Sequence, residues 1–253
     1  MQAIPQISEA SMYDICLTLD VDWAPDWAIS DCAEACARSG VAATFFATHQ
    51  SPVLKELSVD DRFEVGIHPN FLANSSHGQD PKKVIETLLE WYPNATSMRT
   101  HALVQSTALW QMIAMDFPQI SVDVSLLLPF HPIFGRFHYP IVGNSRLHRL
   151  AYNWEDDVSA NDESWHWEDV LPTDTGLQVL DFHPVFLGMN LDRNDRYHRF
   201  KELYAGKFLT VTRDEMSTFD HNGLGARSYF EFVIANKATW YKVSETPMMP
   251  RQE

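Results

Sequence analysis

Short apolar runs alternate with segments of helical periodicity along most of the chain. The apolar runs predict buried strands, and the longer segments between them place apolar side chains at the spacing of a helix. The predicted strands span 15–19, 41–47, 63–67, 95–98, 120–124, 147–152 and 177–182, and the main predicted helices span 27–39, 82–91, 109–115, 192–204 and 227–236. This alternation is typical of parallel sheets, so we predict an α/β barrel of about seven parallel strands.

Polar residues recur where the predicted strands end. Asp20 and Asp22 follow the first strand, and the alternation of side chains along a strand lets both carboxylates point the same way. His68 and His183 each end a buried run and precede a proline, which stops a strand. The remaining polar residues at strand ends are Arg99, His101, Asp156 and Asp157. Because the carboxyl ends of parallel strands meet at one rim, these residues predict a single hydrolytic site.

Composition and charge narrow the class of protein. With 253 residues and 45% hydrophobic content, the chain can form one large domain over residues 1–253. The formal charge of −15 would repel phosphate backbones, so we expect no nucleic-acid partner. The segment Met1–Met12 lacks a basic start and an apolar core, and no stretch approaches the roughly 18 apolar residues of a membrane span. We therefore expect a cytoplasmic protein without a membrane span.

Several of these segments together resemble a known family. The chain is similar to the polysaccharide deacetylases with a NodB homology domain, over roughly residues 14–188. The matching segments are Thr18–Asp22 (TLDVD), Ala43–Phe46 (ATFF), Glu64–His68 (EVGIH), Arg99 and Leu180–His183 (LDFH). The resemblance implies a distorted (β/α) barrel related to the TIM barrel and a metal-dependent carbohydrate deacetylase. It is closest to a divergent branch associated with O-antigen and surface-polysaccharide biosynthesis.

The resemblance also implies a metal site, for Zn²⁺ or another divalent cation. Asp22 and His68 stand where the family has its first two metal ligands. The family's His-x-x-x-His spacing would put the third ligand at position 72, which is Leu72 in this chain. His77 is the nearest histidine and is the third ligand that we predict, with Asn70 or water as alternatives. Carboxylate and imidazole donors of this kind suit zinc.

The family's catalytic roles fall on three further residues. Asp20 is implied as the base that takes a proton from water, and His183 as the acid that protonates the departing amine. Arg99 is implied to orient Asp20 and hold it ionised. The Gly-Pro that normally follows the aspartate pair is replaced by Trp23-Ala24.

Four other residues are predicted on the substrate side of the site. His101 stands after Arg99 where the family has proline, and its role is open. Trp154 could stack on a sugar, with core packing as the alternative. Asp156 and Asp157 could grip sugar hydroxyls or orient His183, with a solvated acidic turn as their alternative. The sequence thus predicts a hydrolase that removes an N-acetyl group from a sugar of a surface polysaccharide, an O-antigen or its precursor. A metal-dependent amidohydrolase for a non-sugar amide and a catalytically silent carbohydrate-binding relative are the alternatives.

Overall fold

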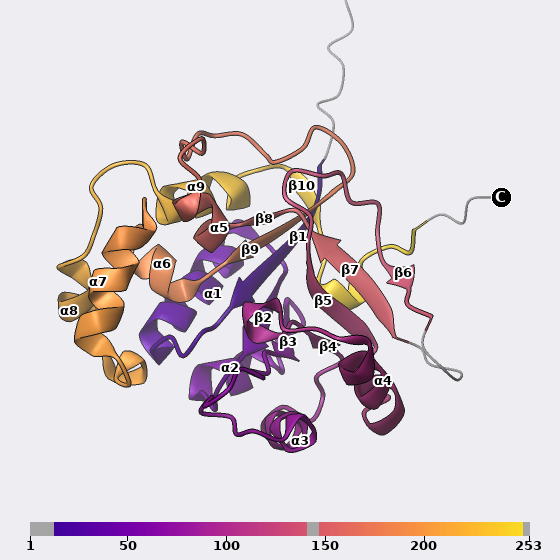
Figure 1. Cartoon of the computed structure of the whole chain (residues 1–253). Coiled ribbons are helices and arrows are strands. Elements are labelled where there is room, and N and C mark those ends of the chain that lie inside the picture. The colour runs from indigo at the N-terminus through magenta and orange to yellow at the C-terminus, as the bar shows by residue number, and fades with distance from the viewer. Residues whose placement is uncertain (1–12, 141–146, 250–253) are drawn as a thin grey trace, which may run out of the picture.

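A mostly parallel β-sheet runs through the molecule, with helices around it (Figure 1). The computed structural model describes residues 13–140 and 147–249. The strands in these residues are β1 Tyr13–Asp20, β2 Ala43–Ala47, β3 Phe63–Ile67, β4 Ser97–Met98, β5 Val122–Leu127, β6 Phe137–His138, β7 His148–Tyr152, β8 Trp154–Glu155, β9 Leu177–Phe182 and β10 Ala238–Trp240. The predicted strands are all present, and the strands β6, β8 and β10 add short pairings that the apolar pattern does not predict.

The helices follow the predicted periodic segments closely. They are α1 Asp26–Ser39, α2 Pro52–Leu57, α3 Pro81–Trp91, α4 Thr107–Asp116, α5 Asp156–Asn161, α6 Pro184–Met189, α7 Asn194–Tyr204, α8 Arg213–Ser217 and α9 Ala226–Ile234, with short 3₁₀ helices η1 His101–Leu103, η2 Phe208–Thr210 and η3 Val243–Glu245. Gly40 ends α1 in the left-handed conformation, with φ of 68°. Among the described residues, no helix combines the length and the apolar character that crossing a bilayer requires.

Both faces of the sheet are packed, as expected for parallel strands. Along β1, the side chains of Ile15, Leu17 and Leu19 belong to the large apolar cluster that the sheet forms with the surrounding helices. Cys16 faces the other way and packs in a second cluster with Val124 and Tyr152. Because side chains alternate, Thr18 and Asp20 lie on the same face as Cys16. This alternation directs Asp20 away from the helices and toward the second, inner face.

The strand order is β6-β7-β5-β4-β3-β2-β1-β9-β8, and β10 pairs with β1. The structure therefore confirms an α/β fold with a mostly parallel sheet, whereas these pairings form an open series and do not confirm a closed barrel. Only Asn153 separates β7 from β8, so one continuous segment pairs with β5 through its first half and with β9 through its second. The Asn153 N–H donates to the Val179 carbonyl at 3.0 Å, and the Asn153 Oδ1 accepts from the Val179 N–H at 2.9 Å.

Candidate active site

Three predicted site residues gather at the rim where the parallel strands end. Asp22 lies two residues after β1, and His68 directly follows β3, where its N–H donates to the carbonyl of Ala47 at the end of β2. His101 begins η1, three residues after β4, and its N–H donates to the Pro69 carbonyl. Because β1 to β4 are parallel neighbours, their carboxyl ends bring residues from positions 22, 68 and 101 to one place.

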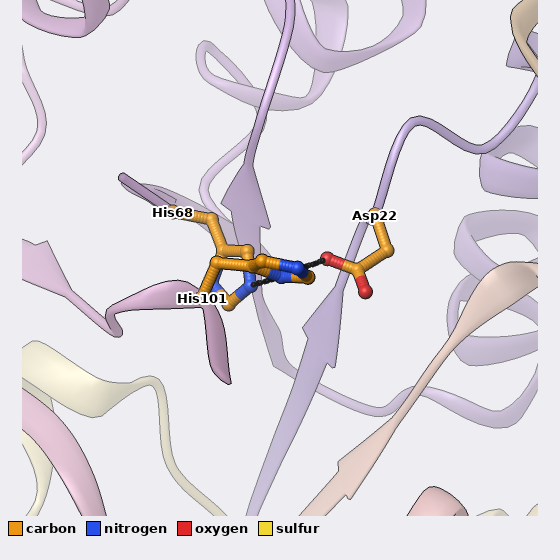
Figure 2. A group of neighbouring side chains, drawn as sticks. All are labelled: Asp22, His68 and His101. Atoms are coloured by element: carbon orange, nitrogen blue, oxygen red, sulfur yellow. Dashed lines mark hydrogen bonds and ion pairs between the residues drawn. The ribbon is translucent and has the colours of Figure 1, made fainter. Parts of the chain in front are cut away.

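The side chains of Asp22, His68 and His101 converge on a common point (Figure 2). One carboxylate oxygen of Asp22 lies 3.2 Å from His68 Nε2 and 3.1 Å from His101 Nδ1. The two imidazole nitrogens lie 3.2 Å from each other. The three donor atoms all lie within 4.8 Å of one another, a cluster that could hold a cation. Figure 2 shows the carboxylate reaching in from one side and the two rings from the other.

Electrostatics keep the Asp22 carboxylate ionised and favour the protonated form of His101. Burial opposes ionisation of Asp22, but the charge of His101 and the hydrogen bonds of both histidines outweigh it and hold the pKa of Asp22 well below its usual range. Burial opposes protonation of His101, yet Asp22 outweighs it and raises the pKa of His101. An ionised Asp22 carboxylate therefore faces two imidazoles, and a divalent metal could use these donors by displacing the proton of His101.

A buried ion-pair network lies beside the cluster and is centred on Arg99. The Arg99 guanidinium is fully buried and donates from Nη1 to Asp20 Oδ1 at 2.8 Å and, by a shorter contact, to Asp181. Its Nη2 donates to Thr18 Oγ1 at 3.0 Å, and Thr18 in turn donates to Asp181. One oxygen of Asp20 is thereby fixed by Arg99. The other, Oδ2, lies 3.5 Å from His68 Nε2 and faces the cluster.

His183 completes the rim from the end of β9. Its Nδ1–H donates to Asp156 Oδ1 at 2.6 Å, and its backbone N–H donates to the second oxygen of Asp156 at 2.8 Å. Burial opposes protonation of His183, but the adjacent Asp156 outweighs it and holds the pKa of His183 well above its usual value. The other ring nitrogen, Nε2, lies 3.7 Å from Asp22 Oδ2. His183 is therefore oriented, protonated and directed at the cluster.

A carboxylate–arginine pair and a carboxylate–histidine pair beside a possible cation site form a hydrolytic arrangement, and the sequence comparison agrees with it. The family model for WbmS-like polysaccharide deacetylases matches residues 17–201. The chain belongs to this WbmS-like polysaccharide deacetylase family. Its fold is similar to that of a Bordetella bronchiseptica protein assigned as a polysaccharide deacetylase involved in O-antigen biosynthesis, with a TM-score of 0.74 and 29% identity over 87% of this chain and 89% of that one. No curated protein matches the chain.

The structure does not place His77 with the ligand group of this WbmS-like deacetylase. The His77 Nε2–H donates to the Thr48 carbonyl at 2.7 Å, and its Nδ1 accepts from the Asn70 N–H at 3.1 Å. Both ring nitrogens of His77 are therefore hydrogen-bonded to the backbone, and neither is free to bind a metal. His101, predicted on the substrate side, takes the third place beside Asp22 and His68. This geometry favours His101 over His77, the nearest histidine that we predicted from the sequence, and the third ligand stays a prediction.

Trp154, Asp156 and Asp157, predicted on the substrate side, differ in their burial and contacts. Trp154 is 1% exposed and packs against Phe182 and Tyr229 in the core, so a sugar cannot reach its ring. Asp156 is fully buried and positions His183, which was one of its two predicted roles. Asp157 is half-buried at the start of α5, and its carbonyl accepts from the side chains of Asn161 and Asn194, away from the cluster.

One residue of the network, Asp181, was not predicted as part of the site. It lies inside β9, is fully buried, and shares Arg99 with Asp20. Burial raises the pKa of Asp181 well above its usual value. A carboxyl group within an otherwise apolar strand was the sequence signal that could have identified it, because such a group requires a buried partner.

Proposed function

We propose that this WbmS-like family member is a zinc-dependent hydrolase that removes the N-acetyl group from a sugar. The observation that carries the proposal is that Asp20 and His183, a candidate base and a candidate acid, both lie beside one candidate ligand group. Asp20 Oδ2 lies 3.5 Å from His68 Nε2, and His183 Nε2 lies 3.7 Å from Asp22 Oδ2. Amide hydrolysis requires a proton to be removed from water and another to be delivered to the leaving nitrogen, and these two residues stand where both transfers can occur.

Asp22, His68 and His101 would hold the cation. One carboxylate oxygen facing two imidazole nitrogens is a donor set that suits Zn²⁺, and three protein ligands leave further coordination positions open. When bound, the cation supplies Lewis acidity that polarises the acetamide carbonyl and makes the attacking water more acidic.

The chain's own residues then account for the proton transfers. Asp20 takes the proton of the attacking water at Oδ2, while Arg99 holds Oδ1 and compensates the carboxylate charge. His183 delivers a proton from Nε2 to the amine nitrogen as the carbon–nitrogen bond breaks. Asp156 holds the His183 ring by two hydrogen bonds and favours its protonated form, so the acid is ready before the bond breaks.

The proposed substrate is an N-acetylated sugar of a surface polysaccharide, an O-antigen or its precursor. The support is membership of the WbmS-like polysaccharide deacetylase family and the fold similarity to the Bordetella bronchiseptica protein, which is assigned to O-antigen biosynthesis. The net charge of −15 also disfavours strongly anionic partners over neutral sugars.

Metal removal tests the proposal directly. We expect the purified protein to release acetate from N-acetylated amino sugars, to lose this activity after treatment with a chelator, and to regain it when zinc is added. The measurement is acetate release from a panel of free, nucleotide-linked and oligomeric N-acetylated sugars, with acetamides and cyclic ureides that lack a sugar as controls. Activity on the non-sugar amides alone would instead indicate an amidohydrolase of another specificity, and sugar binding without zinc binding would indicate a silent relative.

The pH profile is expected to depend on Asp156. In the variant Asp156→Asn the charge that raises the pKa of His183 is lost, so His183 gives up its proton at a lower pH. The alkaline limb of kcat should therefore move to lower pH, and the rate on that limb should fall toward the loss of about 10²–10⁴-fold that removal of a general acid causes. The neighbouring variant Asp157→Asn makes the same chemical change outside the network. An equal shift in both variants would contradict the role of Asp156.

A further inference from the structure

Trp23 lies between two histidines at the edge of the proposed metal site. Its ring contacts the ring of His101 edge-on, with 5.3 Å between centroids and an interplanar angle of 83°. On its other side it tilts against His77, with 5.5 Å between centroids. Trp23 therefore connects the histidine that we propose as a ligand with the histidine that the structure excludes from the ligand group.

The backbone at this point adopts a conformation that costs free energy. Asp22 has φ of 44° and Trp23 has φ of 56°, so two consecutive residues with bulky side chains occupy the left-handed region. A residue other than glycine is strained in this region and persists there only where the surroundings enforce it. Here the Trp23 N–H donates to Thr48 Oγ1 at 3.0 Å, which ties the turn to the end of β2. A glycine would adopt this conformation without strain, so the side chain of Trp23 needs another explanation.

His101 lacks the support that a metal-binding histidine usually has. Such a ligand normally donates its second ring N–H to a carboxylate or a carbonyl, which fixes the orientation of the ring. Across residues 13–140 and 147–249, the hydrogen bonds of the His101 ring all involve Nδ1, the atom that faces Asp22 and His68. The ring is instead confined by its edge-on contacts with Trp23 and with His68, whose ring centroid lies 5.3 Å away.

His77 gives the Trp23 ring a fixed surface to pack on. Its two ring nitrogens bond to the Thr48 carbonyl and to the Asn70 N–H, so the imidazole cannot rotate without breaking a backbone hydrogen bond. Burial lowers the pKa of His77, which favours the neutral ring that both hydrogen bonds require. Thr48 contacts both partners, because its hydroxyl accepts from Trp23 while its carbonyl accepts from His77.

From these contacts we infer that Trp23 is a positioning residue that holds His101 as the third metal ligand, and that His77 acts through Trp23. The inference deepens the proposed function and rests on its metal site. The edge-on contact with Trp23 takes the place of the hydrogen bond that orients other metal-binding histidines. The strained backbone is retained because it directs the indole onto His101.

Zinc titration by calorimetry of the chelator-stripped protein tests this role, beside thermal unfolding of the same metal-free samples. Trp23→Gly removes the ring and relieves the backbone, so we expect zinc to bind about 10- to 100-fold more weakly, the range typical for loss of an orienting partner. Trp23→Phe keeps an aromatic ring at the same position and should recover most of this loss. The matched control is Phe130→Gly, which also removes an aromatic residue with positive φ, at 57°, outside the contacts described above. It should leave the zinc affinity unchanged.

The expected pattern separates positioning from general stability. The unfolding temperature of metal-free Trp23→Gly should change no more than that of Phe130→Gly, while only Trp23→Gly loses zinc affinity. Wild-type zinc affinity in Trp23→Gly would overturn the inference, and so would a loss of affinity in Trp23→Phe as large as in Trp23→Gly. If the wild type itself binds no zinc, the proposed metal site fails and the inference with it, a result distinct from one in which only Trp23 is dispensable.

Discussion

Asp20→Asn is expected to remove nearly all turnover and to leave zinc binding in place. The amide keeps the size of the carboxylate and can still accept the hydrogen bond from Arg99 through its oxygen, so the buried network loses a charge but keeps its shape. The amide cannot take a proton from water, however. A positioned general base contributes about 10²–10⁴-fold to the rate, and we expect a loss of that size in kcat.

Two measurements decide the role of Asp20. Zinc titration of Asp20→Asn should give the wild-type affinity, because Asp20 contributes no atom to the Asp22–His68–His101 group. Acetate release should fall on every sugar that the wild type accepts. Full activity in the variant would show that another group is the base, and lost zinc binding would show that Asp20 is a ligand.

His101→Ala is expected to lose zinc and activity together, whereas His77→Ala should keep most of both. His101 Nδ1 lies 3.1 Å from the carboxylate of Asp22 and 3.2 Å from His68 Nε2, so its removal leaves two protein ligands. We expect at least a 1,000-fold weaker zinc affinity, equivalent to about 4 kcal/mol. His77 has no free nitrogen, and its loss should act only through Trp23.

Comparing the two variants tests whether His77, the ligand predicted from the sequence, or His101, the ligand that the geometry supports, binds zinc. Calorimetric zinc titration gives the affinities, and acetate release gives the activities. The His101→Gln variant serves as a second control, since it retains a polar side chain of similar reach. If His77→Ala lost zinc more severely than His101→Ala, the loop that carries His77 would have to rearrange on metal binding and our ligand assignment would be wrong.

The strands and the rim of the site could be predicted because they depend on local signals. β3 and β9 begin and end at the predicted residues, since each is a mostly apolar run followed directly by a histidine and a proline. The convergence of Asp22 and His68 follows from parallel pairing alone. Short elements such as β8 and β10 escaped prediction because two or three residues carry no measurable periodicity.

The placement of His101 beside Asp22 and His68, and the choice between sugar stacking and core packing for Trp154, could not be settled from the sequence, because both depend on tertiary packing. The family spacing fell on Leu72, and His77 was favoured as the nearest histidine, but its loop folds back onto Thr48 and both nitrogens of the His77 ring bond to the backbone. His101 comes from the next strand, so only the pairing of β3 with β4 brings it to the cluster. Trp154 is the first residue of the two-residue strand β8, and its side chain faces the core. So short a strand has no hydrophobic pattern from which this direction could be predicted.

The pairing of β1 with β9 fixes the separation of Asp20 and His183, the proposed base and acid. Leu19 lies opposite Phe182 in this pair, so Asp20 and His183 are the next residues on two directly bonded strands. Ligand atoms of Asp20 and His183 lie within 4.8 Å of each other. The gap between them is thus preorganised by backbone hydrogen bonds and needs no domain closure. Folding therefore already bears the entropy cost of bringing the proposed base and acid together. The energy of sugar binding is not needed for that step and can stabilise the transition state instead.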